Sequence, residues 1–266
     1  MSNNEIKTAV ALEEDRLEHI STVDDYDMHH ERHRIFPDVF ENRNHKRILD
    51  VAAGIGVVGN RIKNNYKTEL ICNDISPTCL NSLKKLGIET CSFDLDDPNK
   101  PFPFPDKHFD AIIGLAVIEH LIHIDNFVKE IRRVLKDDGY LYISAPNYSG
   151  LTYLFPMLVN GKTFHDPMKE ESKYEFYAHL RYFTYGTLLE YISSFGFTPK
   201  NVYIGVPKNG TRYLKLKSKS KIKAFLFKYG MTMLYKIFSP RWAAEPVTCF
   251  QKSEISSLTK PKKVIL

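Results

Sequence analysis

The stretch Arg47-Ile-Leu-Asp-Val-Ala-Ala-Gly-Ile-Gly56 decides how this chain folds. An apolar run closes on Asp50 and is followed at once by a turn of small residues, which predicts a parallel strand ending in a carboxylate. The loop beside that carboxylate is thin enough for a ligand to lie against its backbone. Because ligands of open α/β sheets bind at the carboxyl ends of the strands, we expect a binding site at this turn.

Glycine spacing alone leaves the ligand open. Gly54, Gly56 and Gly59 follow the pattern Gly-x-Gly-x-x-Gly, and Asp74 comes twenty residues after Gly54, as in dinucleotide-binding proteins. Asp50, however, would repel the pyrophosphate of a nicotinamide dinucleotide and attract an α-ammonium group. S-adenosylmethionine carries that ammonium and no phosphate, so it is the favoured cofactor. A nicotinamide-dependent oxidoreductase is the alternative.

Further strands are predicted to bring polar side chains to the same edge. Residues 69–74 end on Asp74, whose carboxylate can accept hydrogen bonds from both ribose hydroxyls. Ile75 would then pack on the adenine. A short strand over 89–93 precedes Asp94, which can accept a hydrogen bond from the adenine amino group.

The strand predicted over 109–115 is followed by Ala-Val-Ile-Glu119-His120-Leu. Residues 128–147 have the pattern of a helix followed by a strand, and residues 179–197 that of a further helix. With these segments, the chain resembles the class I S-adenosylmethionine-dependent methyltransferases (type 11/12-like) from about Lys46 to Lys252. Their usual pattern is Asp-x-Gly-x-Gly-x-Gly, an acid after strand two and Glu-His-Leu after strand four. The resemblance implies that the cofactor contacts Asp50, Ala52, Gly54, Gly56, Asp74, Ile75, Asp94, Leu95 and Leu115.

One position departs from this pattern. Ala52 stands where these enzymes have their first turn glycine, and alanine enters positive φ less readily and adds a methyl group where the cofactor approaches. Gly54 and Gly56 remain, so we expect a slightly altered turn and a retained site. A non-catalytic cofactor-binding relative is the alternative.

The resemblance implies an α/β fold with a Rossmann-like, doubly wound sheet of seven strands, mixed because the last strand is antiparallel. We expect N-terminal helices over the cofactor site, then the S-adenosylmethionine-binding core and an inserted lid or substrate segment. The C-terminal part of the sheet follows, with a basic helical insertion, and then a flexible tail. The boundaries are 1–45, 46–147, 148–178, 179–252 with the insertion at 208–242, and 253–266.

Composition agrees with one α/β unit. The 266 residues include 43% hydrophobic residues, enough for a sizeable core, and no apolar run reaches the length of a membrane span. The first residues, Met-Ser-Asn-Asn-Glu, lack the basic and apolar parts of a secretory signal. Four cysteines without a Cys-x-x-Cys pair indicate buried thiols, so a cytoplasmic enzyme is expected.

Histidines are the candidates for acid–base work. Methyl transfer to a hydroxyl oxygen needs a base near the acceptor proton, and His120 and His179 are the predicted catalytic residues, with packing as the alternative role. The predicted acceptor is a small molecule, a saccharide or a lipid-linked intermediate, methylated on oxygen. Residues predicted to contact it are Tyr26, His30, Asn147, His165 and Arg181.

Glu119-His120 is also similar to families of this fold that hold a divalent ion through Glu-x-x-Glu-His and a distant ligand. These include small-RNA 2′-O-methyltransferases and ubiquinone-pathway O-methyltransferases. Ala116 stands here at the first glutamate position, so a hard ion would lose an oxygen ligand. We therefore predict no metal, with a metal-assisted O-methyltransferase as the alternative. His29 and His33 share a helical face, but no third ligand is apparent in the sequence.

Charge divides the chain into an acidic body and a basic tail. Residues 1–199 contain 22 Lys and Arg against 30 Asp and Glu, whereas residues 200–266 contain 15 against 2. Lysines at 215–223 precede a predicted helix with one apolar stripe. The stripe consists of Ile222, Phe225, Leu226, Tyr229, Met233 and Ile237. Such a basic amphipathic helix is typical of an element that binds an anionic membrane surface peripherally. Packing within the domain or in a homodimer is the alternative, and nucleic acid is not expected because no binding motif is recognised.

Overall fold

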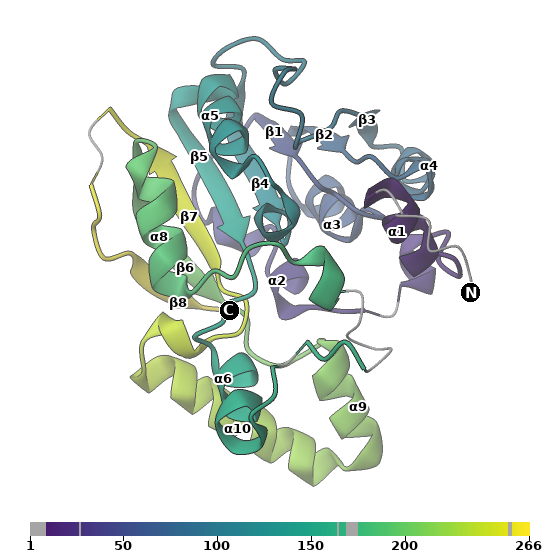
Figure 1. Ribbon diagram of the computed structural model, residues 1–266, viewed down its shortest axis with the longest axis vertical. Helices are drawn as coiled ribbons and strands as arrows, with labels where there is room; N and C mark the ends of the chain where they lie inside the picture. Colours follow the sequence, from purple (N-terminus) through teal and green to yellow (C-terminus); the bar gives the residue numbers. More distant parts are fainter. Residues whose placement is uncertain (1–8, 27, 164, 169–174, 255–256) are drawn as a thin grey trace.

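The computed structural model describes residues 9–26, 28–163, 165–168, 175–254 and 257–266. These residues build one mixed sheet with helices on both of its faces (Figure 1). Its eight strands are β1 (Arg47–Asp50), β2 (Glu69–Asn73), β3 (Glu89–Cys91), β4 (Phe109–Leu115), β5 (Leu135–Ser144), β6 (Phe197–Ile204), β7 (Val247–Lys252) and β8 (Lys262–Ile265). Their order across the sheet is β3-β2-β1-β4-β5-β7-β6-β8. Only β7 runs against its neighbours, so the expected doubly wound fold with an antiparallel strand is confirmed.

Helices connect most of these strands. They are α1 (Ala9–Arg16), α2 (Glu31–Arg34), α3 (Val57–Asn65), α4 (Pro77–Lys85), α5 (Ile124–Val134), α6 (Leu151–Asn160), α8 (Tyr185–Ser194), α9 (Thr211–Lys219) and α10 (Lys221–Ile237). Single 3₁₀ turns are η1 (Val23–Asp25), η2 (Asp38–Phe40), η3 (Ile118–His120) and η4 (Pro240–Trp242). Helix α4 shows why such elements begin where they do: Pro77 occupies its first turn, and Ser76 Oγ accepts a hydrogen bond from Cys79 N at 3.1 Å.

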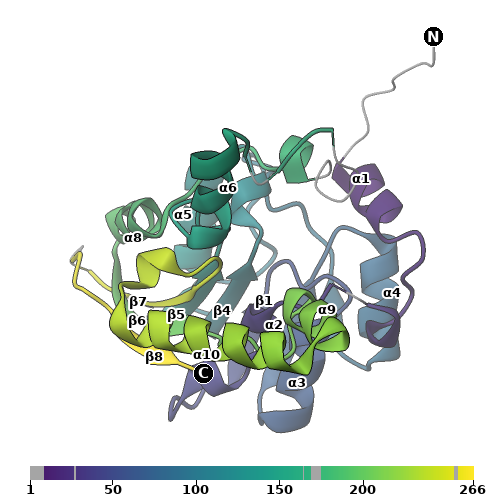
Figure 2. The ribbon, with the colours of Figure 1, turned by 90° about the horizontal axis from the view of Figure 1, so that it is seen from below.

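Two apolar layers hold the sheet. On one face Ile112 and Ile143 pack with Phe127 of α5 and Ile192 of α8. The other face carries a second cluster, formed by β1, β4 and β5 with α3 and the segment around η2. That cluster includes Phe36, Phe40, Ile48, Ile62, Ala111, Ile113 and Tyr142. Figure 2 shows α5 and α8 on one side of the strands and α3 on the other. Both faces of β4 are therefore covered, which explains its continuous apolar sequence.

The sheet has one strand more than the seven predicted. The tail expected to be flexible contains β8, which pairs parallel with β6 from Asn201↔Lys262 to Ile204↔Ile265. Val264 packs against the second core cluster, and Leu266 N donates to Ile204 O at 3.0 Å. This edge strand was missed because its sequence, Lys-Lys-Val-Ile, is short and half charged.

Three helices lie beyond the carboxyl ends of β4 and β5, at the lower end of the molecule in Figure 1. Helix α6 belongs to the predicted lid at 148–178, of which 164 and 169–174 fall outside the described residues. Helices α9 and α10 form the predicted basic insertion at 208–242. Among the described helices, none has the length and apolarity needed to cross a bilayer.

Candidate active site

Two left-handed glycines shape the turn between β1 and α3. Gly54 has a φ of +55°, and no heavy atom lies within 4 Å of the position that a Cβ would occupy, so its backbone faces open space. Gly56 has a φ of +94°, and the Leu83 side chain lies 2.8 Å from its Cβ position, so a larger residue would clash with α4. The backbone of Ala52 stays outside positive φ, which explains why alanine fits this position.

Two carboxylates meet beside this turn. Asp50 is 2% exposed, and burial raises its pKa to about 7, with repulsion from Asp74 adding to the effect. Asp74 accepts hydrogen bonds from Gly54 N at 2.8 Å and from Ser76 N at 2.9 Å, while burial raises its pKa as well. No cation in the described part of the chain contributes to either shift, so these two neighbouring acids suit a positively charged ligand. A ligand with an ammonium group and ribose hydroxyls fits both acids.

The remaining predicted cofactor residues lie at the carboxyl ends of β2, β3 and β4. Ile75 is half-buried directly after Asp74, Asp94 is exposed, and Leu95 and Leu115 are buried. The structure therefore brings the predicted residues to one edge of the sheet.

Asn73 was missed by the sequence analysis, although it organises this edge. Its Nδ2 donates to Val51 O at 2.8 Å and to Phe93 O at 3.2 Å, and its Oδ1 accepts from Phe93 N at 2.9 Å. One buried amide thus ties the loop after β1 to the segment after β3. A polar residue just before Asp74 in an apolar strand was the signal that could have revealed it.

The N-terminal segment rests on the same turn. Glu14 of α1 accepts hydrogen bonds from Thr78 Oγ1 at 2.7 Å and from Thr78 N at 3.2 Å, which fastens α1 to the start of α4. Tyr26 packs with Leu17 against Ile55, which lies between the two turn glycines. The predicted substrate residue Tyr26 therefore lies beside the expected cofactor position.

Titratable residues gather after β4: Glu119 and His179 are buried and His120 is half-buried. We call Glu119, His120 and His179 the Glu119 cluster; one ligand atom from each lies within 4.8 Å of the others. The backbone carbonyl of Glu119 accepts hydrogen bonds from Leu180 N at 2.8 Å and from Arg181 N at 3.1 Å. These backbone bonds bring the residues just after the predicted lid to the carboxyl end of β4, although the two segments lie about 60 residues apart.

The Glu119 side chain is the unusual member of the cluster. It is 1% exposed, and neither carboxylate oxygen has a hydrogen-bond partner among the described residues. Burial raises its pKa to about 7, although nearby Arg32 favours the charged form. A buried carboxyl group that titrates near neutral pH can hold or release a proton during a reaction.

Burial favours the neutral forms of His120 and His179. His120 Nδ1 donates to Ala178 O at 3.0 Å, so in the neutral ring Nε2 is the atom that accepts a proton. That Nε2 lies 3.9 Å from Glu119 Oε1, and burial lowers the pKa of His120. Burial and two neighbouring histidines lower the pKa of His179 to about 3, and its Nδ1 lies 3.2 Å from Tyr148 OH.

The Glu119 cluster also has the composition of a metal site. One carboxylate and two imidazoles are ligands that zinc or iron accepts, and the Nδ1 hydrogen bond of His120 fixes its free nitrogen toward Glu119. Ala116 provides no ligand, as the sequence indicated, and its backbone holds a left-handed φ of +52°. The absence of a metal stays a prediction, and the third potential ligand, His179, is a finding of the structure.

Two predicted substrate residues border the cluster. His165 is 7% exposed, and its ring centroid lies 4.9 Å from that of His179 and 5.7 Å from that of Tyr153. Arg181 is half-buried, and its Nη2 donates to Ile122 O at 3.0 Å. The lid segment thus supplies an aromatic and imidazole wall beside the predicted base.

The other two predicted substrate residues have structural partners. Asn147 is buried, and its Nδ2 donates to Arg241 O at 2.8 Å and Ala243 O at 2.6 Å, while its Oδ1 accepts from Tyr185 N at 2.8 Å. Both ends of its amide are thus bonded within the protein, and its contact with a substrate stays a prediction. His30 Nδ1 lies 3.1 Å from Glu245, which also pairs with Arg32. His30 is thus tied to the loop before β7.

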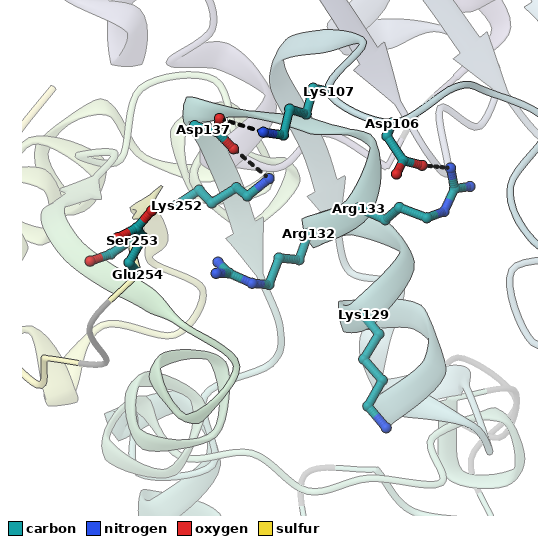
Figure 3. A pocket seen from close by; sticks show the side chains of 9 residues that line it. All are labelled: Asp106, Lys107, Lys129, Arg132, Arg133, Asp137, Lys252, Ser253 and Glu254. Carbon is teal, nitrogen blue, oxygen red and sulfur yellow. Dashed lines mark hydrogen bonds and ion pairs between the residues drawn. The ribbon is translucent and has the colours of Figure 1, made fainter.

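A hollow of about 420 Å³ lies at the amino ends of β4 and β5, the end of the strands opposite to the turn after β1 (Figure 3). Its charged side chains largely pair with one another: Asp137 binds Lys107 at 2.7 Å and Lys252 at 3.4 Å. Arg133 binds Asp106 at 2.8 Å. The hollow is separate from the turn after β1 and offers no buried carboxylate of the kind found there.

Comparisons with known proteins agree with this geometry. Residues 19–202 match a family model described as a methyltransferase domain. The chain is 33% identical to ajmaline N-methyltransferase from Rauvolfia serpentina over 113 residues, which cover 41% of this chain and 38% of that protein. It is 35% identical to ubiquinone biosynthesis O-methyltransferase from Pelagibacter ubique over 52 residues, 20% of this chain and 22% of that protein. The chain thus spans well under half the length of these relatives.

A solved structure extends the likeness to the whole fold. A S-adenosylmethionine-dependent methyltransferase from Thermotoga maritima, described as a possible histamine N-methyltransferase, superposes with a TM-score of 0.55 at 14% identity. The match covers 84% of this chain and 89% of that one. At this identity the likeness concerns the fold alone. The relatives methylate nitrogen in one case and oxygen in another, so they leave the acceptor atom open.

Proposed function

Since this chain belongs to the methyltransferase-domain family, we propose that it transfers the methyl group of S-adenosylmethionine to an oxygen atom of a small-molecule, saccharide or lipid-linked acceptor. The cofactor supplies an electrophilic methyl group on a sulfonium. Family and fold indicate S-adenosylmethionine, and the paired acids Asp50 and Asp74 support it, because a dinucleotide would bring phosphate charge to the same edge.

Each residue of the cofactor edge has a role in this proposal. Asp50 attracts the α-ammonium group, and the open backbone at Gly54 allows close approach. Asp74 retains lone pairs for the ribose hydroxyls, because each of its oxygens accepts one backbone N–H. Tyr26 and Ile55 restrict water on the side of α1.

The observation that carries the oxygen acceptor is the buried carboxyl group of Glu119, which has no hydrogen-bond partner among the described residues and lies beside the Nε2 of His120. A hydroxyl group must lose its proton as the new carbon–oxygen bond forms, and a base in hydrogen-bond reach assists that loss. His120 Nε2 accepts the proton, and the Glu119 carboxylate stabilises the resulting imidazolium. The lowered pKa of His120 keeps it in the neutral, proton-accepting form at pH 7.

The test is a methyl-transfer assay with labelled S-adenosylmethionine and hydroxylated acceptors of the three classes, with the product atom assigned by NMR. His120→Gln should lower kcat/KM by roughly a hundredfold to ten-thousandfold, the usual contribution of a general base, and leave cofactor affinity unchanged. His123→Gln is the matched control, because His123 is 46% exposed and binds the backbone of Asp96. Methylation at nitrogen or carbon, or an unaffected His120→Gln enzyme, would refute the proposal.

A further inference from the structure

Helices α9 and α10 form a basic hairpin at the lower end of the molecule (Figure 1). Residues 201–244 contain Lys and Arg but neither Asp nor Glu. The start of α9 is fixed to the body, because Glu31 Oε1 accepts hydrogen bonds from the backbone of Lys208, Asn209 and Gly210 at 2.5, 2.8 and 2.7 Å. The hairpin therefore holds a defined position with a strongly positive charge.

The apolar stripe predicted from the sequence faces outward. Ile222 is 74% exposed, Phe225 66% and Tyr229 60%. The opposite side of α10 makes the packing contacts: Tyr235 packs with Ile204, the last residue of β6, in a small core of its own. Because α10 is apolar on both sides, its outer stripe needs a further apolar partner.

A groove of about 490 Å³ lies between the two helices and combines both properties. Its polar lining consists of Thr232 and the four lysines Lys217, Lys221, Lys228 and Lys236. Phe225, Tyr229 and Met233 of the stripe line it as well, together with Tyr213. Cationic groups around an aromatic floor match a ligand with an anionic head and a hydrocarbon chain.

Helix α6 presents a second exposed apolar surface at the same end. Leu158 is 80% exposed, Phe155 65% and Val159 61%. Seen from below, α6 lies on one side of the strands and α9 and α10 on the other (Figure 2). Both surfaces can thus meet one flat partner that covers the end of the molecule where the candidate active site lies.

We propose that this end of the protein docks on an anionic phospholipid bilayer, with α10 lying in the interface and phosphate head groups bound by the four groove lysines. A second copy of the chain would bring like charges together. A nucleic acid would leave the exposed Ile, Phe and Leu side chains in water. An anionic bilayer satisfies both the lysines and the apolar residues. Docking does not depend on which acceptor is methylated.

The first experiment measures binding of the full chain to phosphatidylcholine vesicles with and without phosphatidylglycerol. Binding is expected only with the anionic lipid, and added salt should release the protein. A Gln variant of Lys217, Lys221, Lys228 and Lys236 should bind several hundredfold more weakly, roughly fivefold for each lysine. A Gln variant of the exposed Lys67, Lys84, Lys85 and Lys129 removes the same charge elsewhere and should bind like the wild type.

The second experiment tests insertion, which charge attraction alone would not produce. Trp242 is the only tryptophan, so Phe225→Trp in a Trp242→Phe background reports on α10 alone. Lipids brominated in the acyl chain should quench its fluorescence. The proposal would be overturned if both lysine variants bound equally weakly or if the brominated lipids did not quench the fluorescence. A concentration-dependent dimer that buries Phe225 in vesicle-free solution would overturn it as well. Cofactor affinity of each variant checks that the fold is intact.

Discussion

Replacing Asp50 by Asn should make the ligand-free protein more stable. In the unfolded chain this carboxyl group ionises near its ordinary pKa of 3.8, whereas burial raises its folded pKa to about 7. A group with a raised folded pKa stabilises the fold fully below the unfolded pKa, and that stability is lost as pH rises through the folded pKa. Three pKa units correspond to roughly 4 kcal/mol. Asn carries no charge at any pH, so the variant avoids this loss.

The measurement is urea unfolding of the ligand-free protein between about pH 5 and pH 8. Across that range the stability gap between Asp50→Asn and wild type should widen by about 2.5 kcal/mol in favour of the variant. Asp138→Asn is the control, because it removes a carboxylate from an exposed position of β5. An equal gap at pH 5 and pH 8 for Asp50→Asn would show that the buried carboxylate is not what destabilises the fold.

The same variant should bind S-adenosylmethionine more weakly. Loss of a charged partner for the ammonium group costs about 1.5–3 kcal/mol, or roughly tenfold to a hundredfold in Kd by calorimetry. Wild-type affinity should itself fall as pH drops below about 7, because protonated Asp50 no longer attracts a cation. Higher stability together with weaker binding separates this effect from general damage to the fold. Unchanged affinity would mean that the ammonium group lies elsewhere.

Three further outcomes are expected. Asp74→Ala should weaken binding of S-adenosylmethionine and of its demethylated product by about 1.5–3 kcal/mol each in calorimetry. Affinities equal to those of the wild type would show that the ribose does not bind at Asp74. Gly56→Ala should lower the free energy of unfolding by roughly 1–3 kcal/mol in urea titration, because its φ of +94° and the nearby Leu83 oppose a methyl group. Methyl transfer should survive EDTA, and complete loss reversed by a divalent ion would show that the Glu119 cluster holds a metal.

The cofactor edge was predictable because its signals are local. Asp50 directly follows an apolar run, Asp74 follows the next predicted strand, and parallel strands place their carboxyl ends together. Asn147 shows the limit of such reasoning. It follows β5 at the same edge, yet the loop before β7, almost a hundred residues later, occupies its side chain.

Features that depend on distant packing could not be predicted. Residues 180 and 181 return to the backbone of Glu119 from about 60 residues away, and the local sequence does not indicate that contact. Helix α10 carries apolar residues all round, so the sequence could not decide which stripe faces the body. In the fold, the contact of Tyr235 with Ile204 shows which side of α10 packs against the body. The short strand β8 likewise depends on an edge that only the completed sheet offers.

The backbone bonds from Leu180 and Arg181 to Glu119 determine when the candidate active site is complete. His179 lies on the same piece of chain as Leu180 and Arg181, whose N–H groups those bonds engage. Any movement that lifts this piece to admit an acceptor therefore withdraws His179 from Glu119. In the proposed function His120 is the base, and the same movement removes Ala178 O from His120 Nδ1, the bond that leaves Nε2 as the proton-accepting nitrogen. On that proposal, seating residues 178–181 and fixing the proton-accepting nitrogen are one event.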